Sequence, residues 1–581
     1  MARYAELHAH SGFSFLDGAS DPEELVAEAV RLELSGLALT DHAGLYGVVR
    51  FAEAARALGL PTVIGAELTL GATDDRTGVP DPTGEHLVVL AEGPDGYVAL
   101  SRLLGEAHLA RGEKGTPRLT RAEVVEAASS WRVLTGCRKG SLNQALLRDG
   151  PAAARRALDE LVADFGRDRV VVELWDHGAI DDVARNDVLA DLAVRAGVGL
   201  VATNNVHYAT PRDFPRAQVL AATRARRTLD EMDGWFEASP LAHLRGDAEQ
   251  RRRFARWPGV VDAAGELAAA LAFDLHLVAP RLPRFATPEG LDEQAYLVRL
   301  VEEGATRRYG PRDAERVPGA WRQIDHEMAV IGGLGFAGYF LTVWDITEFC
   351  RRQNIYCQGR GSAANSAVCY SLGITNADAV SLKLFFERFL SPSRDGPPDI
   401  DVDIESGRRE EVLQYVFERY GRHHAAQVGA VITYRSRSAV RDVARAFGYP
   451  EEEAAGLRDR IDRATWTAPE DVPPLVPTLA SELLDRPRHL GLHSAGMVIC
   501  DRPILEVCPV EWARTPGRTV LQWDKDDCAA IGLVKFDLLG LGMLEALHRA
   551  VDEVSAFYDV TLDLGALPQD PAVYDMLCEA D

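Results

Sequence analysis

The first third of the chain alternates short apolar runs with stretches of helical periodicity, and this rhythm limits its possible folds more than any other feature. In the stretch DPEELVAEAVRLEL, Asp21 is placed as a helix N-cap and Pro22 at the first helical position. Strand–helix alternation at this spacing predicts a parallel sheet closed into a βα barrel. The seven apolar runs are YAELH, LALTDH, TVIGAEL, HLVVLA, RVLTGC, VVVELW and LVATNN.

Most of these predicted strands end on side chains that can bind a metal ion. In βα barrels the carboxyl ends of the strands hold the chemistry, so ligand-type residues there indicate a shared site. A single histidine is more often a structural or surface residue, but several such strand ends are harder to explain in that way. The residues concerned are His8, Asp41 with His42, Glu67, Cys137, Glu173 and Asn205.

Composition indicates a large protein of the cytosol. At 581 residues the chain is expected to form three or four domains. No apolar run reaches the ~20 residues of a membrane span, and the N-terminus lacks a signal-peptide layout. The eight cysteines are scattered without a CxxC pair, which favours a reducing compartment. The net charge of −25 argues weakly against a general nucleic-acid coat, although local basic surfaces could still bind DNA.

Residues 397–405 read PPDIDVDIE and alternate strictly between acidic and apolar side chains. A period of two predicts a strand with one buried face and one acidic face. Two interpretations are equally open at this point. The strand could be a charged, water-exposed edge strand, or its carboxylates could bind a pair of divalent cations. The acids are Asp399, Asp401, Asp403 and Glu405.

The stretch IYCQGRGSAANSAVCYSLGI, residues 355–374, predicts a strand that enters a glycine turn followed by a helix starting at Ser362. Glycines let the backbone approach a ligand closely, and free N–H groups at a helix start attract phosphate. Arg360 adds a charge-assisted donor. Such a turn by itself is only weak evidence for a phosphate-binding site. Together with the acidic strand ~35 residues later, it suggests a triphosphate cradle beside metal-binding carboxylates, which is the arrangement that nucleotidyl transfer requires.

A third carboxylate is expected from LVKFDLLGLG, residues 533–542. Asp537 is the only acid in this apolar run, and a single charge there is costly unless it is paired or metal-bound. Lys535 lies two residues earlier and would share its face, where it could lie over the triphosphate.

The pattern LHAHS…D…TDHAGLYG…GAE…HLVVLA…TGC…NNVHY resembles the polymerase-and-histidinol-phosphatase (PHP) domain, a distorted seven-stranded barrel with up to three metal ions. The family usually has an aspartate two residues before the last histidine, where this chain has Asn205. A neutral amide holds a divalent cation less well than a carboxylate, so metal binding, with Zn²⁺ or Mn²⁺ as candidates, is expected more than phosphoesterase activity. An inert, purely structural barrel is an equally open alternative. The ligands that the resemblance implies are His8, His10, Asp17, His42, Glu67, His86, Cys137 and His207.

Over the whole chain, GRGSAANS, FERFL, PPDIDVDIE, HSAGMVI and KFDLLGL, in this order after such a barrel, resemble the bacterial family C DNA polymerases, the polymerase III α-subunit type. The resemblance implies a catalytic triad of Asp401, Asp403 and Asp537 that binds Mg²⁺ or Mn²⁺. Asp399 and Glu405 would then be structural. The residues implied for triphosphate binding are Gly361 and Ser362, with Arg388 and Lys535 neutralising its charge.

Within that family, LDEMDGW, VITYRSRSAVRDVARAFG and HSAGMVI resemble the error-prone branch associated with DNA damage and translesion synthesis. The alternatives are the replicative polymerase III α subunit and a metal-dependent phosphoesterase or 3′→5′ exonuclease that acts from the barrel. A third possibility is a binding scaffold without catalytic power.

Three arginines recur every four residues in VITYRSRSAVRDVARAF: Arg437, Arg441 and Arg445. On a helix this spacing places them on one face. The functional interpretation is a basic stripe that contacts DNA phosphates, and the alternative is a merely solvated face.

The expected layout is a barrel at 1–280, an α+β nucleotidyltransferase palm at 281–430 and 512–560, and an inserted helical thumb at 431–511. The proline-rich segment 279–290 would link barrel and palm. Residues 561–581 would begin a fingers domain, so we expect the chain to be the N-terminal part of a longer protein. The resemblance implies primer–template DNA and dNTPs as substrates, and a sliding clamp and damage-response proteins as partners through regions outside this sequence.

Overall fold

The computed structural model describes residues 3–236, 239–391, 397–398, 400–562, 564, 567 and 570–579. Contacts divide the chain into two compact units. The first is formed by Met1–Pro280, Ala426–His493 and Arg502–Leu533, and the second by Arg281–Ala425, Ser494–Asp501 and Val534–Asp581. The barrel, palm, thumb and fingers limits expected from the sequence remain predictions.

The N-terminal part of the first unit contains a six-stranded sheet that is closed into a barrel by the segment before it. Residues 4–10 lie between the two edges: the Ala38 amide donates to the Glu6 carbonyl at 2.8 Å, and the His10 amide donates to the Val206 carbonyl at 2.7 Å. The expected seventh strand therefore pairs through isolated bridges and not through a regular ladder. The strands follow the sheet in chain order: β1 (Leu37–Leu39), β2 (Thr62–Leu70), β3 (Glu85–Ala91), β4 (Trp131–Leu134), β5 (Val170–Leu174) and β6 (Gly199–Ala202).

The prediction of an all-parallel sheet is wrong for β3, which pairs antiparallel with both β2 and β4. Residues 71–84 join β2 to β3 without a helix, whereas the crossover between two parallel strands is usually helical. The reversal matters for the site. His86 pairs with Thr69 near the end of β2, so the first residues of β3 lie beside the last residues of its neighbour.

Helices connect most of the strands, and the first begins as expected. Pro22 is the first residue of α1 (Pro22–Arg31), and the Glu24 carboxylate accepts the Asp21 amide at 3.1 Å. The other helices of residues 1–280 are α2 (Val48–Leu58), α3 (Gly93–Ala110), α4 (Arg121–Ala127), α5 (Ser141–Asp149), α6 (Pro151–Phe165), α7 (Asp182–Ala196), α8 (Phe214–Ala225), α9 (Asp247–Arg253) and α10 (Val260–Leu271).

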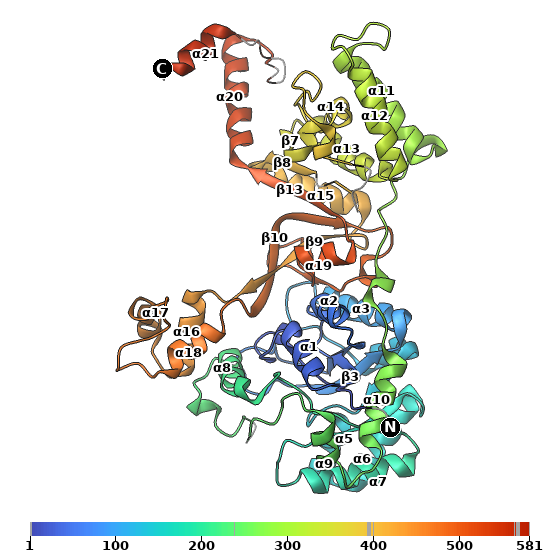
Figure 1. Cartoon of the computed structure of the whole chain (residues 1–581), viewed down its shortest axis with the longest axis vertical. Coiled ribbons are helices and arrows are strands. Elements are labelled where there is room, and N and C mark those ends of the chain that lie inside the picture. Colours follow the sequence, from blue (N-terminus) through green and yellow to red (C-terminus); the bar gives the residue numbers. More distant parts are fainter. Residues whose placement is uncertain are drawn as a thin grey trace. The chain divides into compact units, whose positions relative to one another are not determined.

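The rest of the first unit combines three helices with four strands of a seven-stranded sheet. The helices α16 (Ser436–Ala446), α17 (Glu451–Arg460) and α18 (Leu475–Glu482) form the orange cluster in Figure 1. Val440 and Val443 of α16 share one buried core with Val219 and Leu220 of α8. These four strands have the order β11-β12-β9-β10, with β9 (Ala425–Thr433), β10 (Pro487–Ile499), β11 (Val510–Trp512) and β12 (Thr519–Leu521), and α19 (Lys525–Ile531) follows them in the chain.

The second unit is a sheet packed with helices around a single hydrophobic core. Its strands have the order β10-β13-β8-β7, with β7 (Cys357–Arg360), β8 (Asp401–Glu405) and β13 (Lys535–Leu541). The helices are α11 (Glu293–Tyr309), α12 (Ala320–Gly333), α13 (Ala337–Arg352), α14 (Ala367–Leu372), α15 (Arg409–Tyr420), α20 (Gly542–Tyr558) and α21 (Pro571–Cys578).

The acidic strand β8 is an interior strand. It pairs in parallel with β13 and antiparallel with β7, which excludes the interpretation as a water-exposed edge strand. Its apolar residues Val402 and Ile404 are buried in the core, as the alternation predicts. The acidic face is covered as well, because Asp403 and Glu405 are only 4% and 3% exposed. Buried carboxylates on an interior strand require partners.

The last helices of the second unit, red in Figure 1, are largely exposed and carry apolar side chains such as Met543, Phe557 and Leu577. Among the described residues no single helix is long and apolar enough to cross a membrane, although α12 and α13 together would pass that test as a bent pair. All eight cysteines are free thiols.

Candidate active sites

Strand register brings the three predicted palm carboxylates into one region of the second unit. Asp401 on β8 pairs with Asp537 on the neighbouring β13, and Asp403 follows two residues later on the same face. On the other side of β8, Arg360 at the end of β7 pairs with Asp401. Asp399 lies outside the described residues.

Each of these carboxylates has a cationic partner. The Arg360 guanidinium lies 3.0 Å from Asp401 Oδ2 through Nη2 and 2.9 Å from Asp403 Oδ2 through Nε. Lys535 forms an ion pair with Asp537 Oδ2, so the prediction that the two share a face is confirmed. Asp537 Oδ1 is buried and has no hydrogen-bond partner. Three carboxylates with an unsatisfied oxygen fit divalent cations, although Arg360 now lies between two of them.

The turn at residues 359–361 favours glycine at its first and last positions. The Gly359 amide donates to the Ile374 carbonyl at 2.6 Å, and a Cβ on Gly359 would lie 2.7 Å from that oxygen. Gly361 has φ of +70°, where a side chain would be strained. The helix predicted from Ser362 is present in two parts: Gly361–Asn365 form a 3₁₀ helix, and α14 begins at Ala367.

A buried carboxylate that the sequence analysis missed holds the start of α14. Glu327 of α12 is fully buried, and its oxygens accept the Ser366 hydroxyl and the amides of Ala367 and Val368 at 2.7–3.0 Å. Burial raises the pKa of Glu327 although these donors oppose the shift. The N–H groups of α14 are therefore already occupied, so a phosphate would have to be bound by the 3₁₀ turn and Arg360.

Replacing Glu327 by alanine should lower the free energy of unfolding of the second unit by about 3 kcal/mol or more, because several buried donors lose their acceptor. Urea unfolding followed by fluorescence measures the change. The matched control is Asp325→Ala, since Asp325 lies on the same helix but is exposed and pairs with Arg312. Equal effects of the two substitutions would contradict a structural role for Glu327.

Two other residues singled out from the sequence, Glu405 and Arg388, are not part of this group of paired carboxylates. Glu405 binds His548 Nδ1 at 2.7 Å, and the His548 ring stacks on Tyr356, so this acid anchors α20 to the sheet. Arg388 ends the 3₁₀ helix Phe386–Arg388 and is exposed. Its contact with a triphosphate remains a prediction.

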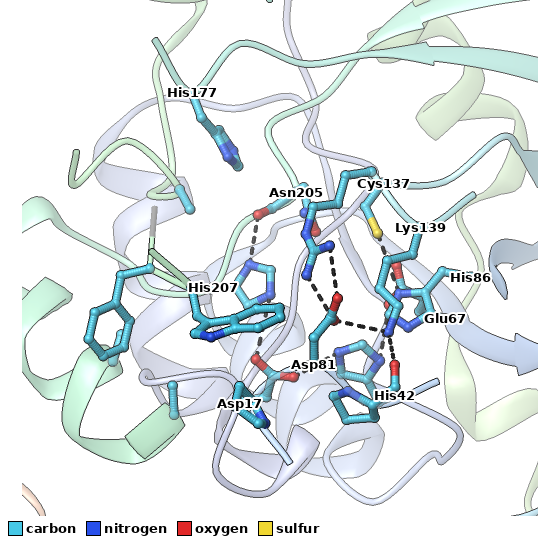
Figure 2. A pocket seen from close by; sticks show the side chains of 18 of the residues that line it. Asp17, His42, Glu67, Asp81, His86, Cys137, Lys139, His177, Asn205 and His207 are labelled. Atoms are coloured by element: carbon cyan, nitrogen blue, oxygen red, sulfur yellow. Dashed lines mark hydrogen bonds and ion pairs between the residues drawn. The ribbon is translucent and has the colours of Figure 1, made fainter. Parts of the chain in front are cut away.

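The barrel brings together all eight predicted metal ligands. Glu67 at the centre lies 3.2 Å from His8, 3.0 Å from His42 and 2.6 Å from His86. Asp17 lies 3.1 Å from His42 and 3.7 Å from His207, and Cys137 Sγ lies 3.4 Å from His86. Figure 2 shows Asp17, His42, Glu67, His86, Cys137 and His207 around one pocket. Three groups have ligand atoms within 4.8 Å of one another: His10, His42 and His207; His8, His10 and Glu67; and His42, Glu67 and His86.

The contacts around the ligands indicate that they face a common centre. His42 Nδ1 and Glu67 Oε2 are buried without a hydrogen-bond partner, although charged neighbours are close. His8 Nδ1 contacts the Glu173 carboxylate at 2.6 Å, and His207 Nδ1 contacts the Asn205 carbonyl at 2.9 Å. The Nε2 atom of each ring can therefore bind a metal ion. Glu173 is therefore a partner of a ligand, although it stands at a strand end like the ligands themselves.

The protonation states of Glu67 and of three histidines suit metal binding. Burial lowers the pKa of His10, His86 and His207, so these rings are neutral near pH 7. Burial would raise the pKa of Glu67, but His86 and His42 outweigh it and hold that pKa well below its ordinary value. Burial would lower the pKa of His8, but Glu173 and Glu67 outweigh it and raise that pKa to about 10, so this ring must lose a proton before it binds a divalent cation.

The matching family models agree with this arrangement. Residues 6–177 match the PHP domain, and residues 295–540 match the bacterial DNA polymerase III alpha NTPase domain. Curated error-prone DNA polymerases of Mycobacterium bovis, Nocardia farcinica and Corynebacterium efficiens are 58%, 54% and 48% identical over the whole of this chain. The chain resembles the error-prone branch of the bacterial DNA polymerase III alpha family. It spans about half the length of these relatives, covering 53%, 54% and 51% of them.

Solved structures add little. One described as a metal-dependent phosphoesterase from Bifidobacterium adolescentis and an amidohydrolase from Chromobacterium violaceum each cover 35% of the chain, at 20% and 18% identity. Both have a TM-score of 0.24, which supports no conclusion.

The PHP domain contains further polar residues that the sequence analysis missed or misassigned. Asp41, which stands at a strand end, accepts from the hydroxyls of Ser11 and Ser14 at 2.7 Å each and so supports the loop between them. A cavity of about 430 Å³ beside the ligands is lined partly by cations, among them Arg76, Arg138 and Lys139. Arg76 comes from the helix-free segment 71–84, and no sequence motif identified it.

Proposed function

We propose that this chain provides the catalytic palm of an error-prone DNA polymerase, which transfers nucleotides from dNTPs to a primer 3′ end during translesion synthesis. The observation that carries the proposal is the register of Asp401, Asp403 and Asp537 on adjacent strands beside Arg360. The names of the relatives support the error-prone branch.

The palm residues have distinct roles in this proposal. Asp401, Asp403 and Asp537 would hold Mg²⁺ or Mn²⁺, and the bound ions would lower the pKa of the primer hydroxyl and neutralise the leaving pyrophosphate. Arg360 and Lys535 now neutralise the carboxylates. Once cations take that role, both side chains are free to bind the triphosphate, next to Gly361 and Ser362 of the 3₁₀ turn and Arg388.

The substrates and partners follow from the same proposal. Primer–template DNA and dNTPs are the substrates, and a sliding clamp and damage-response proteins would bind through parts of the protein outside this sequence. The protein would act in the cytoplasm.

The test is template-directed primer extension by the full-length protein with Mg²⁺ or Mn²⁺. Extension across an abasic site, with frequent misincorporation on undamaged template, would support the error-prone branch. Accurate extension that stops at the lesion would favour the replicative branch. No extension with either ion would overturn the polymerase proposal.

The exposed face of α16 fits DNA contact. Arg437 and Arg445 are exposed, whereas Arg441 is half-buried and lies 3.2 Å from Asp442. We propose that this face binds the phosphates of the duplex. An arginine stripe on one helix would allow DNA binding despite the net charge of −25.

Replacing both Arg437 and Arg445 by alanine should weaken DNA binding at all sequences. The slope of log K against log salt should fall by about 2, since two phosphate contacts are lost. Fluorescence anisotropy over a salt series measures this slope. The control is the double variant Arg155→Ala/Arg195→Ala, which removes the same charge from exposed PHP-domain helices. If the slope of log K against log salt falls equally in this control variant, the proposal is contradicted.

A second candidate function is metal-dependent hydrolysis of phosphoesters by the PHP domain. It is favoured by the three ligand groups beside a cavity of about 430 Å³ that contains arginines and a lysine. The test uses the full chain with Asp403→Asn, so that palm chemistry is suppressed, and measures release from a DNA 3′ end. Hydrolysis that disappears when His10→Ala is added would support this function, and hydrolysis that persists would contradict it.

A further inference from the structure

The three groups of metal ligands in the PHP domain share members, and this limits how many ions they can hold together. His10 belongs to the groups with His8 and with His207, and His42 belongs to the groups with His86 and with His207. Glu67 belongs to the group with His8 and to the group with His86, so its carboxylate lies between two possible ions.

A neutral imidazole has one lone pair and therefore binds one metal ion, whereas a carboxylate can bridge two ions. The group of His8, His10 and Glu67 and the group of His42, Glu67 and His86 can be filled together, because they share only the carboxylate. When both are filled, the remaining group keeps only His207, so it cannot hold a third ion with the same residues.

A guanidinium is paired with the carboxylate that lies beside that remaining histidine. Arg76 Nη2 lies 2.5 Å from Asp17 Oδ2, and Arg76 Nη1 donates to the Ser14 carbonyl at 3.0 Å. Asp17 is the carboxylate nearest to His207, with Oδ1 at 3.7 Å from Nε2. The neighbouring Asn205 offers only a neutral amide, whose Oδ1 is buried without a hydrogen-bond partner.

The segment that carries Arg76 is held in this position. Arg224 of α8, which is only 8% exposed, donates to the Arg76 carbonyl at 3.2 Å and accepts the Gly78 amide through its own carbonyl at 2.8 Å. An ionised aspartate that already has a guanidinium partner attracts a second cation less strongly.

We propose that the PHP domain holds two metal ions bridged by Glu67, and that the Arg76 guanidinium takes the position of a third cation beside Asp17 and His207. The proposal rests on the metal binding assumed for the second candidate function. In this proposal Arg76, which belongs to none of the sequence motifs, supplies the positive charge that a third metal ion would otherwise supply.

The test counts bound Zn²⁺ per chain by plasma mass spectrometry after gel filtration, with Asp403→Asn present throughout to reduce palm binding. We expect two ions in this background and still two when Asn205→Asp is added, because Arg76 continues to occupy Asp17. The combination Arg76→Ala/Asn205→Asp should bind three. Arg138→Ala/Asn205→Asp is the matched control and should bind two, since Arg138 lines the same cavity but pairs with Asp81.

The outcomes are distinct. Three ions with Asn205→Asp alone, or two ions in the Arg76→Ala/Asn205→Asp variant, would overturn the role of Arg76. No bound ion in any variant would overturn the metal centre itself and with it the second candidate function.

A second measurement does not depend on replacing Arg76. With Mn²⁺, a carboxylate-bridged pair gives an exchange-coupled electron paramagnetic resonance spectrum. This spectrum should be present in Asp403→Asn, in which palm binding is reduced, and lost when Glu67→Gln is added. Only isolated Mn²⁺ signals in Asp403→Asn would overturn the bridged pair.

Discussion

Replacing Asp403 by asparagine should reduce the rate of primer extension by the full-length protein by on the order of 10³-fold, about 4 kcal/mol of activation free energy. Asp403 is only 4% exposed on an interior strand, and water cannot easily replace the lost carboxylate. Asparagine has nearly the same shape, so the fold should persist, with Arg360 still paired to Asp401. The loss should appear in kcat, because the ions that a carboxylate holds act mainly on the transition state.

Single-turnover extension with saturating dNTP measures this rate. Glu411→Gln is the matched control, because Glu411 lies in the same unit but is exposed and pairs with Arg408. Thermal unfolding of both variants checks that the fold is kept. If Asp403→Asn extends primers at the rate of the control, the assignment of the palm carboxylates is wrong.

Divalent metal should stabilise the first unit, and Glu67 should be required for this effect. A ligand that binds only the folded state stabilises it by about 2.7 kcal/mol at 100 times its Kd, which raises the Tm of a large unit by several degrees. Chelation should reverse the shift. In Glu67→Gln the shift should be nearly absent, because two of the three ligand groups contain this carboxylate.

Differential scanning calorimetry with Zn²⁺ and after chelation measures both effects. Glu106→Gln removes one charge from an exposed position on α3 and should leave the metal-dependent shift unchanged. A shift of equal size in Glu67→Gln would show that the stabilising ion binds elsewhere.

Local patterns of the sequence predicted much of what surrounds both sites. The alternation of apolar runs with helical stretches indicated the barrel, and the positions of His8, His42 and Glu67 at strand ends predicted their convergence. This works because the direction and period of a strand are properties of neighbouring residues. Alternation in β8 likewise predicted which side chains enter the core.

Other features depended on contacts between distant residues. The reversed direction of β3 follows from a connection without a helix, and it places His86 at the site. Glu327 and the start of α14 are 40 residues apart, and Arg76 and Asp17 are 59 residues apart. Neither contact can be predicted from the neighbouring sequence, because the local pattern around an acid or an arginine does not show whether its side chain is solvated or buried with a partner.

By itself, the sequence determined the alternation of secondary structure, the chemical types of the ligands and the family that the chain resembles. Only the tertiary structure decided that β8 is an interior strand, that Glu327 caps α14 and that Arg76 lies against Asp17. The physical reason is that burial and charge pairing are set by which elements meet in space. A carboxylate becomes a ligand, a cap or a solvated charge according to the groups that folding brings to it.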